Sequence, residues 1–224
     1  MYIQQIRKRL YFLRDGVSSS SMRKKGVDYR VNLGVPVPRL KEIAKDYYPN
    51  AELANQLWEQ NSRELKLLAI LIQDRKAFEI QDVDHWVVSL NNIELAEQMA
   101  MNLLCKLPDI NKKSGKWIQS EGLYVRITGF LVYMRLFMNG FLPKNNEYGS
   151  YFRFLYQALN SDSGLLRGVA LNSIKQLGKQ SSIQAETVLT ILRNAEQIPE
   201  EIKFHLIEDM EFELENRNYL NYYT

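Results

Sequence analysis

Residues 62–77 read SRELKLLAILIQDRKA, and their apolar side chains recur three and four positions apart. Leu65, Leu68, Ala69 and Ile72 fall on one face of a 3.6-residue helix, which is the pattern of an amphipathic helix with one buried side. Ala69 lies at the centre of that face, where its single methyl group allows a neighbouring helix to come close. The stretch therefore predicts a helix over residues 62–77 that packs tightly against other helices.

Three later segments repeat this arrangement around Ala100, Gly129 and Ala170, at intervals of 31, 29 and 41 residues. The longer third interval contains an insertion with Pro, Asn and Gly at residues 142–150. Positions four before, one before and three after each centre are apolar in ten of twelve cases: Leu65, Leu68, Ile72; Ala96, Met99, Leu103; Val125, Thr128, Val132; and Leu166, Val169, Ser173. Helix pairs that recur at about 30–45 residues are typical of a HEAT-like solenoid.

In the rest of the chain, segments with an apolar helical pattern also alternate with short segments rich in Pro, Gly, Asn or Ser. We expect helices near 2–14, 17–26, 37–48, 51–59, 62–77, 82–89, 92–106, 111–120, 123–139, 147–159, 163–179, 182–195 and 199–216. The prediction is an all-α fold, a HEAT-like-repeat α-solenoid of stacked antiparallel helix pairs, forming one domain over residues 1–224. A non-repetitive helical bundle is the alternative.

Charged residues occupy an equivalent position in each repeat, three places before the small centre: Lys66, Glu97, Arg126 and Arg167. Equivalent positions on stacked helices form a row, with neighbours about 10 Å apart. Solenoids generally line their concave face with the second helix of each pair, so we predict three cations around one carboxylate on a concave wall. Lys175 and Lys179 extend the same flank of the last helix in this row.

The distribution of charge favours an anionic ligand. The net charge is only +3, but residues 196–224 hold eight acids and two bases, whereas the preceding residues hold 27 bases and 18 acids. A basic body with an acidic helix at 199–216 suggests a polyanion-binding surface whose acidic end is turned away from the ligand. Solvated helix faces are the alternative explanation.

Two short basic clusters are candidates for contact with phosphate. The segment KKSGK at 112–116 contains Lys112, Lys113 and Lys116 and opens a predicted helix, whose exposed amides can also bind phosphate. It lacks the full P-loop pattern, so a nucleotide site is not expected. The segment RKK at 23–25 is the second cluster.

Cysteine and histidine exclude several chemistries. Cys105 is the only cysteine, so no intramolecular disulfide forms, and a reducing, cytoplasmic location is expected. His85 and His205 are the only histidines and lack metal-binding partners at useful spacing, so no metal site is expected. No apolar run reaches eighteen residues, and the charged start does not look like a signal peptide, so no membrane association is expected.

Several segments resemble the AlkD-type DNA alkylation-repair family. LGVPVPRLK at 33–41 is similar to the family's LGI-x-x-P opening into a helix. LWE at 57–59 followed by SRE at 62–64 resembles its LW…RE repeat, and YVRITG at 124–129 resembles a later W-x-x-R-x-A helix. The similarity spans roughly residues 1–205, and the order and spacing of the motifs carry it.

The resemblance implies a metal-free and cofactor-free DNA glycosylase that excises N3- or N7-alkylated purines while holding the backbone on a concave basic face. A carboxylate then stabilises positive charge on the departing sugar and aligns water. The family's W-D-x-V-D segment falls on residues 93–97, so Glu97 replaces the catalytic aspartate and Ile93 replaces a tryptophan. The catalytic-site arginine falls on Ile127, and a second tryptophan falls on Asn172.

These departures leave two functions open. The leading hypothesis is a DNA-binding member of this family that grips double-stranded or structured DNA by its backbone, with base excision retained or lost. Tyr124 and Tyr133 are candidates for groove contact, whereas Trp58, Trp86 and Trp117 are expected in the core. The rival hypothesis is a HEAT-like scaffold that binds a protein partner on the same concavity, which the aromatic-rich tail at 219–223 supports.

Overall fold

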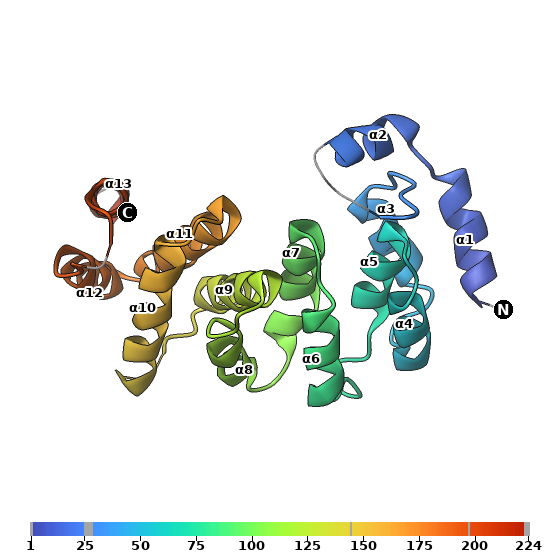
Figure 1. Cartoon of the computed structure of the whole chain (residues 1–224), viewed down its shortest axis with the longest axis horizontal. Helices are drawn as coiled ribbons and strands as arrows, with labels where there is room; N and C mark the ends of the chain where they lie inside the picture. Colours follow the sequence, from blue (N-terminus) through green and yellow to red (C-terminus); the bar gives the residue numbers. More distant parts are fainter. Residues whose placement is uncertain (1, 25–28, 144, 197, 222–224) are drawn as a thin grey trace. The chain divides into compact units, whose positions relative to one another are not determined.

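The structure is a computed structural model that describes residues 2–24, 29–143, 145–196 and 198–221, with the side chains of residues 80, 145–147 and 213–221 also outside the description. Over these residues the chain forms thirteen α helices, one short 3-10 helix and no strand (Figure 1). The predicted all-α class is confirmed. The chain divides into two compact units, Met1–Pro108 and Asp109–Thr224, so the single domain over 1–224 stays a prediction.

Unit 1 contains seven α helices and the 3-10 helix. They are α1 (Tyr2–Phe12), α2 (Gly16–Lys24), α3 (Val37–Ala44), α4 (Ala51–Trp58), α5 (Arg63–Ile72), α6 (Ile80–Val88), α7 (Ile93–Asn102) and η1 (Leu104–Lys106). The helix α5 is central, because it packs against α3, α4 and α7. Leu65, Leu68, Ala69 and Ile72 are all buried there, as the apolar pattern of this stretch predicts.

The helix α5 ends at Ile72, five residues earlier than predicted. The next residue, Gln73, has an extended ψ of 131°, and its buried side chain donates to Asn55 Oδ1 at 3.2 Å. The carbonyl of Ile72 accepts from the amide of Asn50 at 2.8 Å rather than from a later helical amide. A contact between distant segments thus ends the helix, and the local sequence does not encode it.

Unit 1 has a core in which the rings of Trp58 and Trp86 stack with centroids 4.3 Å apart. Trp58 also donates to Ser89 Oγ at 3.1 Å, so its polar edge is satisfied. Both rings are buried, as the sequence predicts for structural tryptophans.

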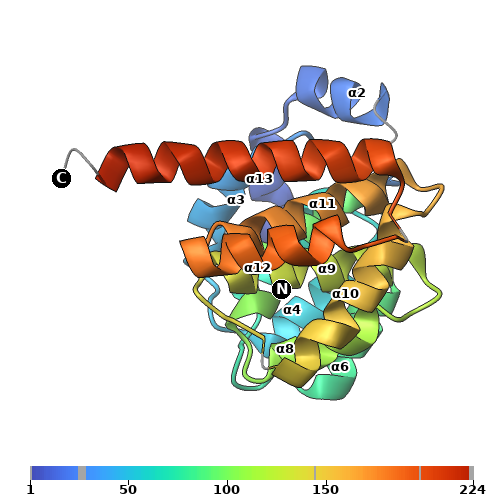
Figure 2. The same cartoon turned by 90° about the vertical axis from the view of Figure 1, so that its left-hand side faces the viewer.

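Unit 2 contains the remaining six helices: α8 (Ile110–Trp117), α9 (Leu123–Met138), α10 (Asn145–Leu159), α11 (Gly164–Gly178), α12 (Ser182–Arg193) and α13 (Glu200–Asn221). Here α9 packs against α8 and α11. The long α13 runs beside α12 and also contacts α11, as Figure 2 shows.

The small centres predicted from the repeats are buried at helix contacts in both units. Ala69, Ala100 and Ala170 are each at most 1% exposed. Gly129 is the tightest contact, because a Cβ there would lie 2.7 Å from Ile118 Cγ2 and 2.9 Å from its backbone nitrogen. The last turn of α8 can approach α9 only because this position lacks a side chain.

Candidate nucleic-acid interface

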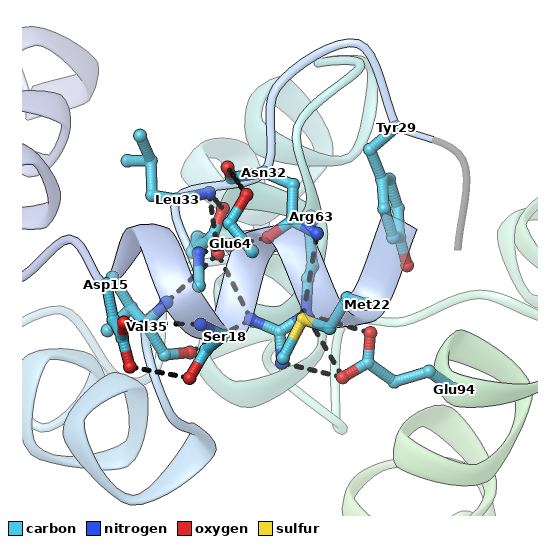
Figure 3. Close-up of polar contacts among 12 residues, drawn as sticks. Asp15, Ser18, Met22, Tyr29, Asn32, Leu33, Val35, Arg63, Glu64 and Glu94 are labelled. Carbon is cyan, nitrogen blue, oxygen red and sulfur yellow. Dashed lines mark hydrogen bonds and ion pairs between the residues drawn. The ribbon is translucent and has the colours of Figure 1, made fainter. Parts of the chain in front are cut away.

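A buried carboxylate joins the loop before α3 to α5. The Glu64 side chain is fully buried and accepts backbone N–H groups from Leu33 at 3.2 Å and from Val35 at 3.3 Å (Figure 3). The adjacent Arg63 donates to the same carboxylate at 3.0 Å and to the carbonyl of Val35 at 2.9 Å. Three backbone groups of the short loop that leads into α3, the amides of Leu33 and Val35 and the carbonyl of Val35, are therefore bonded to Glu64 and Arg63.

Arg63 also joins α5 to α7. Its guanidinium donates from Nη2 and Nε to the Glu94 carboxylate at 2.6 and 2.9 Å, so Arg63 lies between two acids. Burial lowers the pKa of Arg63, but its hydrogen bonds and ion pairs with Glu94 and Glu64 outweigh burial and raise it above the ordinary value. Arg63 is thus charged, and from α5 it binds both the loop before α3 and the helix α7.

The helix α2 is attached to the same loop. Asp15 caps it by accepting the amides of Val17 and Ser18 at 3.0 and 3.2 Å. Gly34 has a φ of +73°, and a Cβ on it would lie 2.1 Å from the carbonyl oxygen of Asp15. Only glycine fits this conformation and this close approach. Of the basic cluster predicted at 23–25, Arg23 and Lys24 are exposed, and Lys25 lies outside the described residues.

The two predicted site residues of unit 1 differ in their surroundings. Lys66 is half-buried, donates to the carbonyl of Trp58 at 2.6 Å and lies 4.4 Å from the centroid of its ring. Burial lowers the pKa of Lys66, against a smaller opposite effect of Glu59. Glu97 is exposed on α7. Lys66 therefore has a structural partner, and its role in DNA binding stays a prediction, as does the role of Glu97 in catalysis.

Unit 2 brings two predicted cations onto neighbouring helices. Arg126 on α9 and Arg167 on α11 are both half-buried, and each lies three positions before a small residue at a helix contact. Arg167 donates to the carbonyl of Ser161 in the loop before its own helix. For the guanidinium of Arg126, the described residues provide no hydrogen-bond or ion-pair partner. Because α9 and α11 pack against each other, equivalent positions on them lie on adjacent helices.

The acidic helix α13 forms ion pairs with a predicted cation of α11 and with an arginine of α12. Lys175 on α11 forms an ion pair with Asp209 on α13. Arg193 on α12 pairs with Glu211 on α13 at 2.5 Å. Lys179 is half-buried. A ligand that binds Lys175 must therefore compete with α13, whereas the sequence suggested an acidic end turned away from the ligand.

The predicted cluster at 112–116 lies on α8. Lys112 and Lys116 are exposed and Lys113 is half-buried. Lys112 pairs with Asp109 at 3.1 Å, which occupies one of the charges proposed for phosphate. Among the aromatic candidates, Tyr124 is half-buried on α9.

The other candidate for groove contact, Tyr133, is buried. It is 6% exposed, and its hydroxyl donates to the carbonyl of Asn111 at 3.4 Å. Its aromatic ring fills the core, so the suggestion of a groove contact is wrong.

The positions that depart from the family motif lie in three environments. Ile127 is fully buried, so an apolar core residue occupies the place to which the resemblance assigns the catalytic arginine. Ile93 is half-buried at the start of α7, and Asn172 is exposed on α11. None of the three can supply the guanidinium or the aromatic ring of the family motif.

Lys66 and Glu97 lie in unit 1, whereas Arg126 and Arg167 lie in unit 2. The single row of four charged residues therefore stays a prediction. Lys66 and Glu97 lie on the packed helices α5 and α7 of unit 1, and Arg126 and Arg167 lie on the packed helices α9 and α11 of unit 2. Within the described ranges, no group of three or more His, Cys, Asp or Glu side chains is arranged to hold a metal ion. The helices that the structure describes include none long and apolar enough to cross a membrane.

Sequence reasoning missed a basic pocket in unit 1. It has a volume of about 370 Å³ and is lined by Lys41, Lys45, Arg75 and Lys106, with Tyr48 among its polar residues. These cations lie near the ends of α3, α5 and η1, outside the predicted row. The spacing of Lys41 and Lys45, four apart on one helix face, was the available signal, but nothing in the sequence placed Arg75 and Lys106 beside them.

Repeated helix pairs packed around small residues define a protein of the HEAT-like helical-repeat class. A solved structure with this fold matches with a TM-score of 0.77 and 17% sequence identity, covering 95% of this chain and 94% of the other. It is described as a new family of proteins related to the HEAT-like repeat DNA glycosylases with affinity for branched DNA structures. At this identity the likeness establishes the fold alone.

The family follows from the sequence model that matches residues 6–186, which is described as DNA alkylation repair enzyme. The chain belongs to the DNA alkylation repair family. The comparison with curated proteins found no significant match.

Proposed function

We propose that this protein binds DNA through its phosphate backbone, prefers branched over linear duplex, and does not excise alkylated bases. The observation that carries the proposal is the pair Arg126 and Arg167, which occupy equivalent positions on the packed helices α9 and α11. Cations spaced along neighbouring helices suit successive phosphates of a strand, and such contacts fix DNA without reading its sequence.

The preference for branched DNA is inferred from the related structure, whose description includes affinity for such DNA. Backbone contacts select DNA by the position of its phosphates in space, so they respond to a junction more strongly than to a base sequence. The chain carries no sequence-reading motif of the usual kinds. We therefore expect the protein to recognise DNA by the shape of its backbone and not by its base sequence.

The loss of base excision is inferred from Ile127. Excision of a cationic purine requires stabilisation of the charge that develops on the sugar and alignment of the attacking water. A fully buried isoleucine contributes neither, and isoleucines, Ile127 and Ile93, occupy the positions to which the resemblance assigns the arginine and the tryptophan. DNA binding without excision fits both the retained cations and the substituted motif.

The test of DNA binding uses the full chain with a fluorescent four-way junction and a linear duplex of equal length. We expect tighter binding to the junction and a steep loss of affinity with added salt. Arg126→Gln and Arg167→Gln should each weaken binding several-fold and lower the salt slope by about 1, because each removes roughly one phosphate contact.

The matched control is Arg193→Gln in the same unit, which removes one positive charge that Glu211 already neutralises. It should leave junction affinity close to that of the wild type. Equal loss in all three variants would reduce the proposal to a non-specific effect of net charge. Absence of DNA binding, together with recovery of a stable protein partner, would favour the scaffold instead.

The test of excision incubates excess protein with duplex containing 7-methylguanine and measures the free base. We expect no release above that of the DNA alone. Release that Glu97→Gln abolishes would contradict the proposal and would assign Glu97 as the catalytic carboxylate.

A further inference from the structure

The basic pocket of unit 1 has the composition of an anion site. Four of its lining residues are Lys41, Lys45, Arg75 and Lys106, and no Asp or Glu lines it. Its apolar lining residues are Ala44 of α3, Ile70 and Leu71 of α5, and Leu103 directly after α7. Charges on an apolar floor are screened less than charges in open water, so their attraction for an anion is stronger.

Three acids are direct sequence neighbours of pocket cations: Glu42, Asp46 and Asp74. Glu42 on α3 pairs with Arg39 at 2.9 Å, and Asp46 in the following turn pairs with Arg9 at 2.7 Å. Both carboxylates are thus occupied by arginines that do not line the pocket. The side-chain ammonium groups of the pocket lysines have no hydrogen-bond or ion-pair partner among the residues that the structure describes. Asp74 does not line the pocket, and its Oδ1 accepts the amide of Lys76 at 3.0 Å, so the lining itself carries four cations and no acid.

The pocket also offers a directed hydrogen-bond donor. Arg75 Nη2 donates to the hydroxyl oxygen of Tyr48 at 2.9 Å. The Tyr48 oxygen is the acceptor in this bond, so its own O–H remains available to donate to a ligand. A hydroxyl beside several cations suits the oxygen atoms of a phosphate ester.

Helix stability explains only part of this arrangement. A cation in the last turn of a helix is favoured by the helix dipole, and Lys41 is in the last turn of α3. That effect acts on each helix separately, however. It does not explain why the basic ends of three elements converge on one cavity that excludes acids, and their mutual repulsion opposes the convergence.

We infer that this pocket binds a phosphate group of a nucleic-acid strand. The inference rests on the proposed function and adds to it a second contact surface, in unit 1, built from residues that the repeat pattern does not mark. An internal phosphodiester and a terminal phosphate share this chemistry, and both are present in branched DNA with strand ends.

The test is the double variant Lys41→Gln/Lys45→Gln in the full chain, measured by fluorescence anisotropy with a three-way junction. We expect about a tenfold loss of affinity at low salt and a salt slope lower by about 1.8, as two lost phosphate contacts predict. The matched control is Lys8→Gln/Lys24→Gln, which removes two exposed charges from α1 and α2 of the same unit. Circular dichroism should be unchanged in both, because all four lysines are exposed.

The source of the phosphate is distinguished by comparing junctions with and without a 5′-phosphate. If the pocket takes a terminal phosphate, the wild type prefers the phosphorylated junction and the double variant loses that preference. If it takes an internal phosphodiester, the variant weakens both junctions equally.

Two further outcomes separate this inference from the proposed function. Affinity that falls in Arg126→Gln but matches the control in Lys41→Gln/Lys45→Gln would overturn the pocket alone. Absence of DNA binding in the wild type would overturn both. An independent readout is ¹H–¹⁵N NMR with inorganic phosphate at constant ionic strength, in which the amides of Lys45 and Lys106 should shift in the wild type and not in the double variant.

Discussion

The two units of this protein bury polar groups in different ways. Unit 1 encloses Arg63 and Glu64, both at most 2% exposed, and holds them with Glu94. The described part of unit 2 buries no charged side chain, and its polar interior consists of hydroxyls, among them Tyr151 bonded to Ser173 at 2.8 Å. Two ion pairs between different helices of unit 2 lie instead at the surface, where they join α13 to α11 and α12.

This difference shows what a buried charge contributes here. A buried ion pair adds little net stability over an apolar core, because desolvation offsets the attraction. Its geometry is directional, however, and in unit 1 it joins the loop before α3 to the helices α5 and α7. In unit 2 the long helices α9 and α11 pack along each other, and the described part of this unit contains no buried ion pair.

The largest effect should come from breaking the buried network with Arg63→Met. The variant leaves the Glu64 carboxylate buried without its cation, which typically costs about 3–5 kcal/mol. Urea denaturation should show this loss, and amide exchange should accelerate in the loop 33–35. The control Arg39→Met removes an exposed partner of Glu42 and should cost less than about 1 kcal/mol. Equal losses would show that the buried network is no more important than a surface pair.

A smaller effect is expected from Tyr151→Phe in unit 2. Loss of the bond to the buried Ser173 hydroxyl should cost about 1–2 kcal/mol, without any uncompensated charge. Its counterpart Tyr148→Phe removes a bond from a half-buried hydroxyl to Gln184 at 2.8 Å and should cost less. Thermal unfolding of both variants checks the order, and a loss from Tyr151→Phe as large as that from Arg63→Met would erase the contrast between the units.

The smallest effect is expected at the surface of unit 2, in Arg193→Gln. Its pair with Glu211 has side chains that are 55% and 46% exposed, so water and salt screen it strongly. The expected change in the free energy of unfolding is about 0–1 kcal/mol, measured by the urea midpoint in low and high salt. A larger, salt-sensitive loss would mean that the packing of α13 depends on its ion pairs. The ion pairs of the two units would then differ in burial but not in their contribution to stability.

The sequence predicts much of the fold, because apolar periodicity and small residues act locally. The four small centres are buried where expected, and the predicted ranges differ from the observed ones by one residue at the end of α9 and by one residue at each end of α11. The early end of α5 could not be predicted in this way, since the amide of Asn50 and the side chain of Asn55 determine it from outside the helix.

The candidate site was less accessible to sequence reasoning. The repeat pattern predicted that Arg126 and Arg167 lie on packed helices, and α9 and α11 do pack against each other. The pattern could do so because equivalent helices of successive repeats bury the same positions. The repeat pattern could not show that Lys66 lies over the ring of Trp58, because that contact depends on side-chain direction. Nor could it show that Lys175 pairs with Asp209, because α13 lies outside the repeats. The basic pocket combines residues from three elements, and only their packing reveals it.

The carboxylate of Glu64 has one more consequence, for the evolution of the chain length near residue 35. It binds the amides of Leu33 and Val35, and α3 begins directly after this loop, at Val37. Insertion of a single residue between the bound amides and the helix would rotate every later side chain of α3 by about 100°. Lys41 and Lys45 would then turn away from Arg75 and Lys106, so natural insertions should be tolerated before residue 33 and excluded between 35 and 41.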